Sequence, residues 1–324
     1  MDEPWESTFI ETNRITVHAV VAGPHDGPLV VLLHGFPEFW YGWRKQIGAL
    51  AAAGFRVVAP DGRGYNLSEK PPAVRDYALD RLAADIVGII AAQGRDRAIV
   101  VGHDWGAVVA WWTATRHPSW VARLAILNVP HPAVIQPYLR RHPQQLLRSW
   151  YVFFFQLPWL PETLTRLGNW RAGVRTLRDS SRPGTFSNAD LERYREAWSQ
   201  PGAFTAMINW YRALVRYQPT FAPSRVTLPT LILWGRHDAF LAPELAELSL
   251  NLCIDGRLTV LETTHWVQHE APERVNRELI EFFGGRPSPP PPTAATPLPI
   301  LNQSADQTHI PHAGDHVGFT WVSV

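Results

Sequence analysis

The chain has 324 residues, 46% of them hydrophobic, which is enough for one large core with or without a smaller inserted domain. Its 30 basic and 29 acidic residues are mixed along the sequence, so we expect no nucleic acid partner and no membrane-surface role. The single Cys253 cannot form an internal disulfide, and the N-terminus lacks the features of a signal peptide. Together with the absence of an apolar run of roughly 18 residues, this predicts a cytoplasmic protein without a membrane span.

Alternating segments at residues 7–11 and 15–21, with a turn near Asn13 between them, predict a β-hairpin. Short, continuously apolar runs follow, which is the pattern of strands buried on both faces of a parallel sheet. These runs are Leu29–Leu33, Phe55–Ala59, Ala98–Val101, Leu124–Leu127, Thr230–Leu233 and Leu258–Leu261. The sequence therefore predicts an α/β fold with an eight-stranded, mostly parallel sheet and helices on both faces.

Amphipathic helices are expected between most of these strands. Residues 80–90 provide an example, with Asp80 as the expected N-cap and Gly94 as the stop. Its apolar side chains form one stripe, which consists of Leu82, Ile86, Ile89 and Ile90.

The regular alternation stops within residues 131–223, which are rich in Trp, Phe and Tyr and predict an inserted helical cap domain. The cap would divide a core made of residues 1–130 and 224–285 and lie over the carboxyl ends of the strands. Residues 286–324 form a Pro-rich tail that we expect to be disordered. Its histidines, His309, His312 and His316, are not expected to bind a metal.

A first candidate for chemistry is Asp104, which stands between Gly102 and Gly106 where a buried run leads into a helix. This is the layout of a nucleophile elbow, in which a sharp turn lifts the central side chain and crowds the backbone around it. The alternative is that Asp104 simply caps the helix.

The first buried run ends in a turn, His34-Gly35-Phe36-Pro37-Glu38. Such a turn can leave amides pointing outward, so the backbone N–H groups of Phe36 and Trp105 are candidates for an oxyanion hole. A plain tight turn would also explain the Gly and the Pro.

Two further residues follow later strands, Asp238 after the run at 230–233 and His265 after the run at 258–261. Either one alone is more often a loop cap or a surface histidine. Together they give the chain order nucleophile, acid, histidine that is typical of α/β-hydrolases, each at the carboxyl end of a strand.

With these motifs in place, HGFPE at 34–38, GHDWG at 102–106, Asp238 and His265-Trp266, the chain resembles the soluble epoxide hydrolase branch of the α/β-hydrolase superfamily over roughly residues 5–285. An Asp nucleophile excludes ordinary serine hydrolases but is shared with haloalkane dehalogenases. The resemblance implies an α/β-hydrolase fold with Asp104 as nucleophile, His265 as general base and Asp238 orienting His265.

An epoxide oxygen leaves as an alkoxide and needs a proton, and the resemblance supplies two cap tyrosines for this task, Tyr151 and Tyr211. Helical spacing supports their inward orientation, since each belongs to an apolar stripe. The stripes are Leu147, Tyr151 and Phe154, and Phe204, Ile208, Tyr211 and Leu214. The alternative is that both tyrosines are ordinary core aromatics.

Haloalkane dehalogenase activity is the alternative within the same chemistry, but three positions depart from those enzymes. Many of them place Asn where this chain has Phe36, and some place their acid where it has Asn128. Fluoroacetate dehalogenases carry Arg where this chain has Trp105. A non-catalytic, ligand-binding member of the superfamily is the alternative from another class, although all the expected catalytic groups are present.

The expected activity is hydrolysis of a small, apolar epoxide to a vicinal diol without metal or organic cofactor, by a monomer or a homodimer. Five residues are expected to contact the substrate: Phe36, Pro37, Trp105, Phe155 and Trp266.

Overall fold

The computed structural model describes residues 5–217 and 225–284, and its centre is one eight-stranded sheet in the order β1-β2-β4-β3-β5-β6-β7-β8. The hairpin strands β1 and β2 are antiparallel to each other, β2 is antiparallel to β4, and all other neighbours are parallel. The strands are β1 (Glu6–Thr12), β2 (Ile15–Ala22), β3 (Leu29–Leu33), β4 (Arg56–Pro60), β5 (Ala98–His103), β6 (Val121–Leu127), β7 (Thr230–Gly235) and β8 (Gly256–Leu261). The predicted fold class is confirmed.

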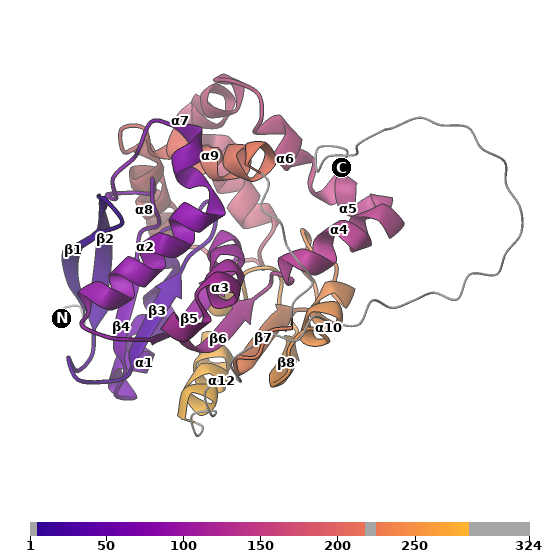
Figure 1. The fold of residues 1–324 in the computed structure, drawn as a ribbon. Coiled ribbons are helices and arrows are strands. Elements are labelled where there is room, and N and C mark those ends of the chain that lie inside the picture. Colours follow the sequence, from indigo (N-terminus) through magenta and orange to yellow (C-terminus); the bar gives the residue numbers. More distant parts are fainter. Residues whose placement is uncertain (1–4, 218–224, 285–324) are drawn as a thin grey trace, which may run out of the picture.

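Helices cover both faces of this sheet, with α2 and α3 on one side and α1 and α12 on the other (Figure 1). The core helices are α1 (Arg44–Ala52), α2 (Leu79–Ala92), α3 (Trp105–Arg116), α10 (Glu244–Leu250), α11 (Val267–Glu270) and α12 (Pro272–Gly284). Short 3₁₀ helices lie at Trp40–Trp43, Val74–Tyr77 and Pro118–Trp120. Because the parallel strands are covered on both sides, those at the centre, such as β3, are buried along their whole length.

Two local predictions were wrong. The run at 258–261 was expected to be buried on both faces, but β8 is the last strand of the sheet and is only partly buried, with Val260 exposed. Asp80 is not the N-cap of α2, because the helix already begins at Leu79. The Asp80 carboxylate instead accepts a hydrogen bond from the indole of Trp112 at 2.8 Å. The stop at Gly94 and the buried stripe of α2 are as predicted.

Between β6 and β7 the described residues form helices and no strand, and these helices lie at the carboxyl end of the sheet (Figure 1). They are α4 (Pro132–Arg141), α5 (Pro143–Arg148), α6 (Trp150–Phe154), α7 (Leu160–Asp179), α8 (Asn188–Ser199) and α9 (Ala203–Arg216). We call this helical layer the cap. Its division from the core at residues 131 and 223 remains a prediction, and the tail at 286–324, with its three histidines, lies outside the described residues.

The predicted stripe on α9 is buried at Phe204, Ile208 and Tyr211. The stripe through Leu147, however, was wrong, because the segment is not one continuous helix. It breaks at Ser149 between α5 and α6, and Leu147 is exposed at the surface, while Tyr151 is half-buried. Across the described ranges, no helix is both long and apolar enough to cross a membrane.

Candidate active site

Asp104 occupies the turn between β5 and α3, with a positive φ of 49°. The turn is possible only with small neighbours, because a Cβ atom on Gly106 would collide with the backbone carbonyl of Leu33, and one on Gly35 would collide with the Asp104 side chain. Although Asp104 is the residue before α3, its carboxylate makes no capping hydrogen bond to the helix. The helix-capping alternative therefore does not describe this side chain, which lines the cavity described below.

The structure brings Asp104, Asp238 and His265 together from the carboxyl ends of three strands. The Nδ1 atom of His265 lies 2.7 Å from Oδ2 of Asp238, and its Nε2 atom lies 3.6 Å from Oδ2 of Asp104. His265 and Asp238 are buried, while the Asp104 side chain keeps some exposure. One imidazole thus lies between two carboxylates, with its orientation set by the closer one.

The Asp238 carboxylate is held by several further donors. The backbone amides of Phe240 and Leu241 donate to its Oδ1 at 2.7 and 3.0 Å, and the Asn128 side chain donates to its Oδ2 at 2.7 Å. Asn128 follows β6 and also accepts a hydrogen bond from the Gly235 amide, so it ties the ends of β6 and β7 together. Asn128 had no predicted role and was noted only as a departure from dehalogenases, although its position directly after a strand was an available signal.

The charges in this site shift the pKa values of its members. Burial by itself would lower the pKa of His265, but Asp238 and Asp104 together raise it to about 10. Burial would raise the pKa of Asp104, but the hydrogen bond and charge of His265, with help from His103 and the Phe36 amide, hold it below its usual value. At neutral pH the resting site therefore contains an ionised Asp104 beside a protonated His265.

Of the two amides predicted to form an oxyanion hole, that of Phe36 donates to Oδ1 of Asp104 at 2.7 Å. The amide of Trp105 belongs to the first residue of α3, directly after Asp104. The turn at 34–38 is fixed by His34, whose Nδ1 lies 2.9 Å from the Gly35 carbonyl and whose Nε2 accepts from the Gly62 amide. Because this amide already donates to a carboxylate oxygen of Asp104, it could also stabilise negative charge that develops on that oxygen during a reaction.

A second buried network lies behind His265. His103 Nε2 lies 2.9 Å from the backbone carbonyl of His265, and Gln268 Nε2 lies 3.0 Å from His103 Nδ1. Gln268 also donates to Glu38, a buried carboxylate that accepts from Tyr194 of α8 as well. Glu38 and His103 were noted in the sequence only as members of the motifs HGFPE and GHDWG. Their hydrogen-bond partners come from distant segments of the chain, so a local sequence pattern could not predict them.

A cavity of about 350 Å³ lies between the core and the cap, and Asp104, His265, Tyr151 and Tyr211 all line it. The rings of Tyr151 and Tyr211 are 5.9 Å apart. Burial and the negative charge of Asp104 raise the pKa values of both tyrosines, so their phenols stay protonated. The cavity therefore holds an ionised carboxylate and two phenol donors in an apolar lining.

Of the five residues predicted to contact substrate, Phe36, Pro37, Phe155 and Trp266 line this cavity, whereas Trp105 does not. Trp105 is buried against Tyr211, with ring centroids 4.9 Å apart. Several other lining residues had no predicted role, among them Trp198 and Phe240. The position of Phe240, two residues after Asp238, is the signal that would have found it.

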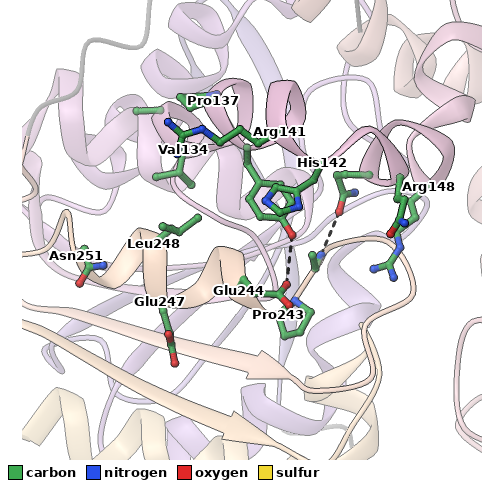
Figure 2. A pocket seen from close by; sticks show the side chains of 15 residues that line it. Val134, Pro137, Arg141, His142, Arg148, Pro243, Glu244, Glu247, Leu248 and Asn251 are labelled. Atoms are coloured by element: carbon green, nitrogen blue, oxygen red, sulfur yellow. Dashed lines mark hydrogen bonds between the residues drawn. The ribbon is translucent and has the colours of Figure 1, made fainter. Parts of the chain in front are cut away.

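A second hollow, of about 650 Å³, lies between the cap helices α4 and α5 and the core helix α10. Arg141, His142 and Arg148 line it from the cap side, and Glu244 and Glu247 from α10 (Figure 2). Asp104, Asp238 and His265 do not line this hollow. Its mixed charges contrast with the aromatic lining of the cavity that holds Asp104. Within the described ranges, no cluster of three or more His, Cys, Asp or Glu side chains could hold a metal ion.

Known proteins share this architecture. The family model described as the alpha/beta hydrolase fold matches residues 28–272. The AB hydrolase superfamily protein YfhM of Bacillus subtilis (strain 168) is 46% identical over 85% of this chain and 96% of that protein, and Epoxide hydrolase 4 of Homo sapiens is 40% identical over 85% and 77%. Among solved structures, an epoxide hydrolase of Bacillus megaterium in complex with an inhibitor aligns with a TM-score of 0.79 and 31% identity, covering 86% of this chain and all of that one.

Proposed function

Because this chain belongs to the α/β-hydrolase family, and within it to the epoxide hydrolases, we propose that it converts an epoxide and water to a vicinal diol through an ester on Asp104. The family membership agrees with the resemblance drawn from the motifs HGFPE and GHDWG. The observation that carries the proposed mechanism is the cavity in which Asp104 shares one apolar lining with Tyr151 and Tyr211.

In the first step, the carboxylate of Asp104 attacks one epoxide carbon while the ring C–O bond breaks. Tyr151 and Tyr211 hydrogen-bond the ring oxygen, and one of them gives it a proton, so that a hydroxyalkyl ester and a tyrosinate remain. The raised pKa values of both tyrosines support this role, because each phenol is protonated at neutral pH and so available as a donor.

In the second step, His265 removes a proton from a water molecule that attacks the ester carbonyl. Esterification removes the negative charge of Asp104, which is one of the two charges that raise the pKa of His265. The proton that His265 holds at rest can then replace the one that the tyrosine gave up, which leaves a neutral imidazole next to Asp238.

The tetrahedral oxyanion is stabilised by the amides of Phe36 and Trp105. Its collapse breaks the bond to the alkyl oxygen, the diol leaves with that oxygen and a proton from the new carboxylic acid, and His265 keeps the proton taken from water. The resting charges of Asp104 and His265 are restored without exchange of a net proton.

A single turnover in ¹⁸O-labelled water, with enzyme in excess over styrene oxide, tests the ester. One oxygen of Asp104 should leave in the first diol, which should therefore be unlabelled, and the label should appear in the Asp104 peptide and in the diol of later turnovers. Label in the first diol would show that water attacks the epoxide directly.

Chloride release from a chloroalkane without diol formation from any epoxide would favour the dehalogenase alternative, and turnover of neither would favour a ligand-binding protein.

A further inference from the structure

The even charge of the whole chain conceals a strong local excess in the first half of the cap. Residues 131–180 contain seven arginines, no lysine, and only Glu162 and Asp179 as acids, a net charge of +5 in a chain with a total of +1. All seven arginines are exposed. Glu162 is paired with Arg212 of α9 and Asp179 with Arg175, while Arg141 and Arg148 share the second hollow with Glu244 and Glu247 of α10. The excess positive charge is therefore carried mainly by the remaining arginines, among them Arg166 and Arg171 of α7. The expectation of evenly mixed charges was wrong for this segment.

The same segment exposes large apolar side chains that ordinarily belong in a core. Leu147, Trp150 and Trp159 are 76%, 62% and 69% exposed. Phe153, Leu157, Leu164 and Leu167 are also exposed, and all seven belong to α5, α6, α7 or the α6–α7 turn. Scattered single apolar residues need no explanation, but a group of this size on consecutive elements is typical of an interaction surface. We call these seven residues, with Arg166 and Arg171 of α7, the mouth surface.

One member of the mouth surface, Trp150, lies at the opening of the cavity that holds Asp104. Trp150, Ala172 and Thr176 all line that cavity and are all exposed, so it opens between α6 and α7. Arg171 directly precedes Ala172 on α7. These helices lie at the end of the molecule opposite α12 (Figure 1). An apolar substrate could therefore pass from an apolar environment in contact with this surface directly into the cavity that holds Asp104.

We infer that the mouth surface rests on an anionic lipid bilayer, with the apolar side chains in the headgroup region and the arginines against lipid phosphates. Exposed tryptophans and leucines next to arginines match the interfacial zone of a bilayer, where the amphipathic indole and the cationic guanidinium are both stabilised. The surrounding positive charge supplies the attraction to anionic headgroups that a plain apolar patch for another protein would not need. The protein would lie on the membrane and not span it.

Co-sedimentation of the whole protein with lipid vesicles tests this inference without any substrate, so its outcome is independent of the proposed reaction. The protein should bind phosphatidylglycerol vesicles at low salt, bind phosphatidylcholine vesicles far more weakly, and leave the former at high salt. The double variant Arg166→Gln/Arg171→Gln should lower the partition coefficient by a factor of about five for each charge, and Leu147→Gln/Trp159→Gln should lower it at least as much.

The matched controls replace exposed apolar residues and exposed arginines of the core in the same way. Phe9 and Ile254 are exposed apolar residues outside the cap, and Arg97 and Arg277 are exposed arginines there. The variants Phe9→Gln/Ile254→Gln and Arg97→Gln/Arg277→Gln should bind vesicles like the parent, and all variants should keep its melting temperature. Equal losses in controls and mouth-surface variants, or no vesicle binding at all, would overturn the inference. A dimer in solution that the mouth-surface variants convert to monomer, without vesicle binding, would assign the surface to a second copy of this chain.

Discussion

The two sides of the catalytic cavity hold their chemical groups in different ways. On the core side, Asp238 receives hydrogen bonds from two backbone amides, from Asn128 and from His265, and all of these belong to strand ends of one sheet. On the cap side, Tyr151 and Tyr211 are positioned by ring packing, with Tyr211 against Phe36, Phe155 and Trp105. The proposed nucleophile and base thus depend on the edge of the sheet, and the proposed proton donors depend on how the cap packs on it.

The largest expected effect is on the core side. His265→Gln removes the base for ester hydrolysis but leaves Asp104 able to attack, so turnover should fall by roughly 10⁴-fold while the ester accumulates. Mass spectrometry of the intact protein after addition of styrene oxide measures this, and a mass increase of one substrate per chain is expected. Loss of turnover without any mass increase would show that His265 is needed before or during the attack.

On the cap side, single replacements should have smaller effects, because each tyrosine can partly substitute for the other. Tyr151→Phe or Tyr211→Phe should lower the alkylation rate roughly 10²-fold, and the double variant should lose far more than either. Stopped-flow measurement of the first step separates this from ester hydrolysis, which should keep its rate. Phe153→Leu, at an exposed cap position next to α6 residues that line the cavity, is the control and should change neither step. Slowed hydrolysis in the tyrosine variants would contradict the division of roles.

The pH dependence of stability should also distinguish the two sides. The folded-state pKa of His265 is raised from 6.5 to about 10, so its stabilisation is fully present below about pH 6.5 and is lost as the pH rises toward 10. Asp104→Asn removes one of the two carboxylates responsible and should end this loss at a lower pH. For the parent protein, we expect the unfolding free energy to fall by roughly a few kcal/mol between pH 6.5 and 10.

Urea unfolding at several pH values between 6 and 10 measures this change. Tyr211→Phe should leave the slope unchanged there, because the pKa of Tyr211 is raised above its usual value and the phenol titrates only at higher pH. A parent protein whose stability does not change across the window would contradict the assigned charge state of His265.

The same contrast explains what the sequence could predict. Strand ends of a parallel sheet meet at one edge, so an Asp or His placed just after a buried run can be assigned to that edge, and Asp104, Asp238 and His265 do meet there. Asn128 met the same condition and was overlooked, because its role depends on a carboxylate 110 residues away.

Predictions in the cap depended on helical periodicity, which fails where a helix breaks. The stripe through Leu147 assumed one helix, whereas α5 ends at Arg148 and α6 begins at Trp150. The prediction that Trp105 contacts substrate came instead from its place beside Asp104 in the core, and a neighbour in sequence can be packed behind the cavity wall, as Trp105 is against Tyr211. The role assignments of all these residues remain predictions for the experiments above.

The smallest expected effect concerns Asn128, which has a positive φ of 54°, so that replacement by Gly removes its side chain without backbone strain. Asn128→Gly leaves the buried carboxylate of Asp238 with one donor fewer and the Gly235 amide without its acceptor, which should cost about 1–3 kcal/mol of unfolding free energy. Asn169→Gly is the matched control, because Asn169 has a similar φ of 55° but an exposed side chain in the cap. It should change stability by less than about 0.5 kcal/mol. Equal losses in both variants would mean that the hydrogen bonds of Asn128 do not stabilise the core edge, and the contrast between a hydrogen-bonded core and a packed cap would lose its main support.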